Sequence, residues 1–115
     1  MTHKFDEIDH AGLDFLANQE FVEYEGMVFR KSVFNKEAID TSLAVGQSKS
    51  SIQLSLNHES LVTYGGSVPQ QRAFAEIIQA NWLERLSSQF PQLYPWVVVE
   101  TSPLEVILSF RVIVR

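Results

Sequence analysis

The chain has 115 residues and a mass of 13.1 kDa, with 45% hydrophobic and 20% charged residues, so we expect one globular domain over residues 1–115. It contains no cysteine, which excludes disulfides, cysteine-ligated zinc, iron–sulfur clusters and thiol catalysis. No stretch reaches the length of about 18 apolar residues that a membrane helix needs, so we expect no membrane-spanning segment.

The formal net charge is −5, and the negative charge is concentrated near the N-terminus. The first 25 residues hold seven acidic residues against one lysine, whereas the other eight basic residues are scattered from Arg30 to Arg115. Nucleic-acid binding needs clustered bases, so we expect no nucleic-acid partner. The acidic segment fits a solvated helix face or a surface that docks a basic partner. The N-terminus turns acidic before any apolar run, unlike a signal peptide, and a cytoplasmic protein is the expectation.

The first third of the chain predicts a helix, a hairpin and a second helix. Residues 4–18 place most of their apolar residues on one helical face. Residues 21–34 predict a β-hairpin that turns at Glu25 and Gly26, through either a two-residue turn or a three-residue loop with Gly26 in the left-handed conformation. Asn35 is expected to cap a short helix that ends at about Val45.

The middle of the chain predicts a second hairpin. Residues 46–51 are polar and indicate a loop. Ile52, Leu54 and Leu56 alternate with polar residues, which is typical of a half-buried strand. A turn over residues 57–60 would lead to a second strand over 61–64.

The last part of the chain predicts a long helix and a third hairpin. Ser67 and Gln70 form a capping-box pattern, and a helix over 69–90 follows with a broad apolar stripe, in which we expect Phe74, Ile78 and Leu86 to be buried. Strands are expected from residue 96 to 100 and from 104 to 114, with a turn at Ser102 and Pro103. The final strand is apolar on both faces, which is typical of a central or covered strand.

Helix and hairpin therefore alternate three times along the chain. This order predicts an α+β fold: an antiparallel sheet of about five or six strands in three hairpins, with two or three helices packed mainly on one face.

Two histidine clusters have the residue types of chemical sites. His3, Glu7 and His10 would share one side of the first helix, as metal ligands do, but a polar first turn explains them and their spacing is not that of zinc hydrolases. His58 lies beside Glu59 and Ser60, but neighbours in a turn cannot align as a catalytic triad. We therefore expect no metal ligand and no catalytic residue from either cluster.

Two further patterns are considered next to simpler explanations. Glu100 and Glu105 would face each other across the last hairpin and form a carboxylate pair, which could do acid–base chemistry or simply lie in water at a hairpin end. Gly65 and Gly66 precede a helix, as in anion sites, but lack the spacing of a phosphate-binding loop, so a strand-to-helix turn explains them.

Aromatic residues give the strongest functional indication. Trp82, Phe90, Tyr94 and Trp96 cluster around the joint between the long helix and the next strand. Most aromatic residues belong to the core, but tryptophan and tyrosine at a surface joint are good anchors for a partner. These four residues are the candidate contact patch.

The sequence therefore favours a non-enzymatic protein-interaction or assembly module, which binds a protein partner or a second copy and needs no cofactor. One alternative is a small-ligand carrier with an apolar pocket between the sheet and the long helix. Another alternative is a small enzyme that uses the carboxylate pair Glu100 and Glu105.

Overall fold

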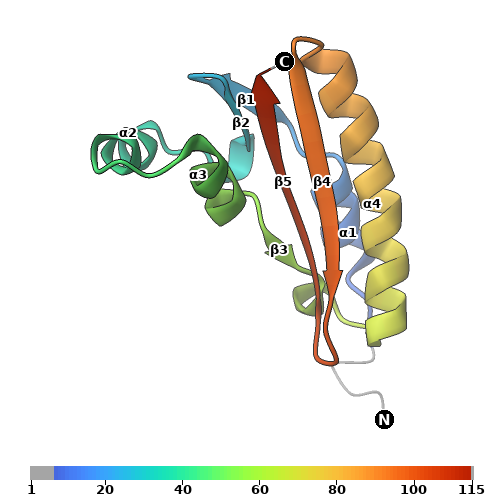
Figure 1. Cartoon of the computed structure of the whole chain (residues 1–115). Helices are drawn as coiled ribbons and strands as arrows, with labels where there is room; N and C mark the ends of the chain where they lie inside the picture. The colour runs from blue at the N-terminus through green and yellow to red at the C-terminus, as the bar shows by residue number, and fades with distance from the viewer. Residues whose placement is uncertain (1–6, 115) are drawn as a thin grey trace.

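The computed structural model describes residues 7–114, which form an α+β fold with two small antiparallel sheets (Figure 1). The elements in chain order are α1 (His10–Ala17), β1 (Phe21–Tyr24), β2 (Met27–Arg30), the 3-10 helix η2 (Lys31–Val33), α2 (Lys36–Ala44), α3 (Lys49–Leu56), β3 (Glu59–Ser60), the 3-10 helix η3 (Leu61–Tyr64), α4 (Val68–Gln89), β4 (Leu93–Thr101) and β5 (Val106–Val114). One sheet pairs β1 with β2, and the other has the order β3-β5-β4. The α+β class is confirmed, but the expected single sheet with three hairpins is wrong, because only the first and third hairpins form. The expected two or three helices are also too few, because four α-helices form within residues 7–114.

The first hairpin has the two-residue turn. Tyr24 lies opposite Met27, and both turn residues have positive φ, 55° at Glu25 and 77° at Gly26. Two left-handed residues in succession match the twist of the flanking strands, and glycine adopts this conformation without strain. The register separates the two faces of β2: Met27 and Phe29 point to one side, and Val28 to the other.

Helix α4 is the main support of the three-stranded sheet and runs alongside β4 in Figure 1. The capping box forms as predicted, with Ser67 and Gln70 each bonding the backbone of the other. Ile78 and Leu86 are buried as expected, but Phe74 is only half-buried, because it lies at the groove between α1 and α4.

Helix α1 is shorter than the predicted helix over 4–18. It begins at His10, where the Asp9 carboxylate caps it by accepting a hydrogen bond of 2.8 Å from the Gly12 amide. Residues 1–6 lie outside the described residues. The helix docks on α4 because the buried indole of Trp82 donates a hydrogen bond of 3.0 Å to the Leu16 carbonyl.

The predicted second hairpin, with strands over 52–56 and 61–64, is wrong. Residues 49–56 form helix α3, capped by the Ser48 hydroxyl, and residues 61–64 form η3. Strand β3 is limited to Glu59 and Ser60. The alternation of Ile52, Leu54 and Leu56 also fits a helix, because residues four apart share a face; Ile52 is buried, whereas Leu54 is 36% exposed.

Two buried amides of α3 explain why this segment is helical. Gln53 and Asn57 lie four residues apart, and neither side chain reaches solvent. The Gln53 carbonyl oxygen accepts from the amides of Val28 at 3.1 Å and Val112 at 3.0 Å, and its NH₂ group donates to the Val112 carbonyl at 3.1 Å. The Asn57 NH₂ group donates to the carbonyls of Val28 at 2.9 Å and Phe110 at 3.4 Å. The two side chains therefore bridge the edges of β2 and β5.

The side chains of Gln53 and Asn57 hold the two sheets next to each other, and helices pack on both sides of the resulting layer of strands. Val28 and the β5 core residues share one hydrophobic cluster with α1 and α4. Met27 and Phe29 form a second cluster on the opposite side with Ile39 of α2 and Ile52 of α3. The prediction that helices pack mainly on one face is therefore wrong for the β1–β2 half. None of the helices between residues 7 and 114 has the length and apolar character needed to cross a bilayer.

Candidate functional site

One side of β4 and β5 carries the candidate site. Alternate residues of both strands point toward α4 and fill the core, as Val97 and its partner Phe110 do. The remaining residues point to the opposite side, which we call the open face. It consists of Tyr94, Trp96, Val98 and Glu100 on β4 and their partners Ile113, Arg111, Ser109 and Ile107 on β5.

Large apolar side chains are exposed at one end of the open face. Tyr94 is 47% exposed and Trp96 is 46% exposed, and their ring centroids lie 6.1 Å apart. Ile113, the cross-strand partner of Tyr94, is 41% exposed. Aromatic groups that are half in water and supported by neighbours are typical anchors of protein interfaces.

The Arg111 guanidinium contacts the Trp96 ring at this aromatic end of the open face. The Arg111 guanidinium lies 5.6 Å from the centroid of the Trp96 ring, and it donates a hydrogen bond of 2.9 Å to the Ser50 hydroxyl of α3. Nearby, Lys49 donates to the Glu25 carbonyl at 2.6 Å. Neither Arg111 nor Lys49 forms an ion pair with a carboxylate of residues 7–114. The aromatic end of the open face therefore carries the cation Arg111, whereas Glu100 lies at the opposite end of the same face.

The structure divides the predicted contact patch. Trp82 is fully buried in the core, and Phe90 is partly buried against it, so neither presents a surface anchor. Tyr94 and Trp96 come together on the open face, and their role in contact stays a prediction. The sequence held a signal for this division, since Trp82 lies four residues from both Ile78 and Leu86 in the apolar stripe of α4. Arg111, which sequence reasoning missed, becomes visible only through its pairing with Trp96.

The outer edge of β4 is protected against pairing with another strand. Pro95 has no amide hydrogen to offer, and the Gln79 side chain of α4 donates a hydrogen bond of 2.8 Å to the Val97 carbonyl. Arg72 also reaches across from α4 to the Thr101 hydroxyl at 2.6 Å. Such devices are typical of strand edges that must not add a strand. A partner would therefore use the face of β4 rather than its edge.

The candidate carboxylate pair has a different register from the one expected. Glu100 lies opposite Ile107, and Glu105 lies in the turn, where its backbone carbonyl accepts from the Ser102 amide at 2.9 Å. The Glu105 carboxylate accepts a hydrogen bond of 2.6 Å from the Ser60 hydroxyl. Glu105 therefore ties the last hairpin to β3, and the expectation that Glu100 faces it directly is wrong.

A buried polar network lies at the junction of β2, β3 and η3. The Arg30 guanidinium pairs with the Glu59 carboxylate at 3.1 Å, and the other oxygen of that carboxylate accepts from the Tyr64 hydroxyl at 2.9 Å. Burial, together with this hydrogen bond, raises the pKa of Tyr64 above its usual range. Arg30 also donates to the carbonyls of Leu56 and His58. These contacts pair the buried Arg30 with a partly buried carboxylate and leave only its Nε atom without a partner among the described residues, which fits a structural role for the network.

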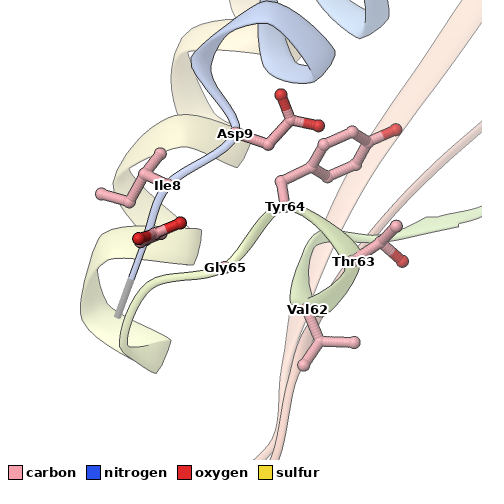
Figure 2. Close-up of a pocket in the computed structure, with 7 residues that line it drawn as sticks. Ile8, Asp9, Val62, Thr63, Tyr64 and Gly65 are labelled. Atoms are coloured by element: carbon pink, nitrogen blue, oxygen red, sulfur yellow. The ribbon is translucent and has the colours of Figure 1, made fainter. Parts of the chain in front are cut away.

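A cleft of about 520 Å³ lies beside this network (Figure 2). The segment that precedes α1 lies against η3, where the Asp9 amide donates a hydrogen bond of 2.8 Å to the Tyr64 carbonyl. Gly65 has a φ of 81°, and a Cβ atom there would lie 2.0 Å from the Glu7 carbonyl oxygen, so only glycine allows this approach. Figure 2 shows the side chains of Asp9 and Tyr64 pointing toward one another, and those of Val62 and Thr63 pointing away. The cleft thus lies between the segment before α1 and the segment around η3. It is not the pocket between the sheet and α4 that a ligand carrier would need.

The histidine clusters do not converge into a site among the described residues. His10 is exposed and makes an edge contact with Phe74, and His3 lies outside the described part of the chain. The Nδ1 atom of His58 lies 3.1 Å from the Ser55 carbonyl of its own helix end. Within residues 7–114, no three histidine or carboxylate side chains are grouped as metal ligands. Gly65 and Gly66 form the turn between η3 and α4.

Side chains of the described residues pack in the region between α4 and the sheet. Ile78, Trp82 and Leu86 pack there with Leu108 and Phe110 in one cluster. Comparison of the chain with protein-family models, curated proteins and solved structures gives no significant match, so the open face is the feature on which a functional argument rests.

Proposed function

We propose that this protein is a non-enzymatic protein-interaction module and that the open face is its contact surface. The single observation that carries the proposal is the paired exposure of Tyr94 and Trp96 on a sheet face, with Arg111 stacked against the indole. A tryptophan held by a cation–π contact loses little conformational freedom on binding, which favours a role as an anchor.

Site-specific photo-crosslinking in the cells that produce the protein tests this proposal. A photoreactive residue replaces Tyr94 on the open face in one variant and Leu83 on α4 in the matched control, because the two side chains are 47% and 43% exposed. We expect a discrete protein adduct from position 94 and none from position 83. The adduct should disappear when Trp96→Ala is added. Adducts of equal yield at both positions, or no adduct at position 94, would contradict the proposal.

A further inference from the structure

We infer that the open face binds an amphipathic helix of a protein partner, and that this helix carries acidic residues beside its apolar stripe. This inference rests on the proposed function and specifies the partner. The first argument comes from the layers of the fold. Helices α2 and α3 cover the Met27 and Phe29 side of the first hairpin, and the Gln53 and Asn57 amides align that side with the open face. Helical cover ends at Arg111, where α3 meets β5 through Ser50.

The length of the two strands fits one helix, with the large exposed side chains at the Tyr94 end and the buried Ser109 in the middle of the face. Strands β4 and β5 have nine residues each, which corresponds to a length of about 30 Å. A helix of about 20 residues has the same length, and its diameter of about 10 Å covers two neighbouring strands. A helix on this face would lie beside α3 and complete the layer that α2 and α3 begin.

The charges specify the sign of the partner. Arg111 lies on the open face beside Trp96, and Lys49 is the sequence neighbour of Ser50, which Arg111 contacts. Neither cation forms an ion pair with a carboxylate of the described residues, and Glu100 lies at the opposite end of the face. Acidic residues on a docked helix would meet these two cations at the border next to α3. Basic residues at the same positions would be repelled by them.

Two other occupants fit the geometry less well. An added strand would need the outer edge of β4, where Pro95 and the Gln79 contact to Val97 prevent regular pairing. A second copy would offer no acidic stripe to Arg111, because Glu100 is the one acidic residue among the eight residues of the open face.

Three synthetic peptides of about 20 residues test the inference. All three carry the same leucine stripe; the first has glutamates beside it, the second has lysines, and the third is the glutamate peptide with a central proline that breaks the helix. Binding to the full chain is measured by fluorescence, in which Trp96 responds because it is exposed and Trp82 is buried. We expect the glutamate helix to bind at least about tenfold more tightly than either of the others.

Variants of the chain test the two parts of the recognition separately. Arg111→Glu should reverse the preference between the glutamate and lysine peptides, whereas Arg111→Lys should keep it. Trp96→Ala should remove binding, which isothermal titration calorimetry measures because this variant lacks the fluorescent reporter. Leu104→Ala is the matched control, because Leu104 is 83% exposed at the tip of the last hairpin. Near-UV circular dichroism of each variant confirms that it is folded. Trp96→Phe replaces Trp96→Ala, and Arg111→Gln replaces Arg111→Glu, if either does not fold.

Three results would overturn the inference: equal affinity for all three peptides, amide shifts that map to the groove between α1 and α4, or a dimer in analytical ultracentrifugation that Trp96→Ala dissociates. A crosslinked partner at position 94 together with no preference among the peptides would refute the acidic helix and leave the interaction module standing. Failure of both experiments would refute the proposed function itself.

Discussion

At the scale of single residues, two side-chain amides replace the missing strand between the sheets. Gln53 satisfies three backbone groups on Val28 and Val112 that a neighbouring strand would otherwise bond. An unpaired buried amide or carbonyl costs about 1–3 kcal/mol of folding free energy. A buried glutamine that pairs three such backbone groups therefore stabilises the fold by more than the burial of its own polar side chain costs.

Replacement of Gln53 by leucine measures this contribution. Gln53→Leu keeps the side-chain volume similar but leaves the backbone groups of Val28 and Val112 without partners, so we expect a loss of about 3 kcal/mol in the free energy of unfolding. Gln47→Leu, at an exposed loop position, is the control and should change the stability by less than about 0.5 kcal/mol. Denaturant unfolding gives both values. A loss below about 1 kcal/mol for Gln53→Leu would mean that water replaces the amide.

A second residue-scale prediction concerns Tyr24, whose hydroxyl donates to the Asp40 carboxylate. This hydrogen bond, more than burial, raises the pKa of Tyr24 from 10.0 to about 12. Since the folded value is the higher one, the stabilising contribution is complete below pH 10.0 and is lost as the pH rises toward about 12. In Asp40→Asn the pKa of Tyr24 should fall toward its ordinary value, which the ¹³Cζ shift of the ring reports. Tyr64 is the internal control, because its bond to Glu59 is unaffected. An unchanged Tyr24 midpoint would show that Asp40 does not set its pKa.

At the scale of elements, α4 offers neighbouring positions with opposite environments. Ile78 is 3% exposed in the core, whereas Ile77 is 67% exposed. Ile78→Ala should lower the free energy of unfolding by about 2–5 kcal/mol, because it removes apolar contacts and leaves a cavity. Ile77→Ala should cost less than about 0.5 kcal/mol. Equal losses in denaturant unfolding would mean that the orientation of α4 is wrong.

The elements that sequence reasoning found are those with a local signal. Helix α4 has a capping box and a long apolar stripe, α2 has the Asn35 cap, and the first hairpin has Gly26 at its turn. Helix α3 has a capping serine, Ser48, but this residue lies in a polar run that also fits a loop, and the short alternating run after it fits both a strand and a helix. Its helical form depends on bonds from Gln53 to Val112, a residue 59 positions away. No pattern local to residues 49–56 reveals that bond.

The candidate site was predictable to a similar degree. The concentration of aromatic residues between 82 and 96 fits either core packing or a contact patch, and the structure divides them: Trp82 is buried, whereas Tyr94 and Trp96 come together on one face of β4. Because residues two apart on a strand share a face, the strand pattern after Pro91 is enough to place Tyr94 and Trp96 together and to exclude Pro95 and Val97 from that face. The position of Arg111 depends on the register of the last hairpin. The sequence predicted Glu105 as the partner of Glu100, whereas the observed partner is Ile107, two residues further along.

At the scale of the whole molecule, β5 connects nearly every part of the fold. It pairs with β4 along its full length and with β3 at Ile107 and Leu108, and it receives the α3 amides at Phe110 and Val112. Phe110 also contacts the Trp82 ring at a centroid distance of 5.4 Å. Both hydrophobic clusters therefore depend on this last strand, one directly and the other through α3.

Deletion of residues 110–115 should consequently abolish the folded state. It removes Phe110 and Val112 from the core, strips Gln53 and Asn57 of partners on one side, and exposes the edge of β4 that faced β5, which invites aggregation. We expect an insoluble or molten product without a cooperative thermal transition or a near-UV dichroism signal. Leu104→Ser, at the exposed tip of the same hairpin, should melt like the intact chain. A sharp cooperative melt of the deletion variant would show that α1, α4 and the first hairpin hold together without the end of β5, and the central position assigned to this strand would be wrong.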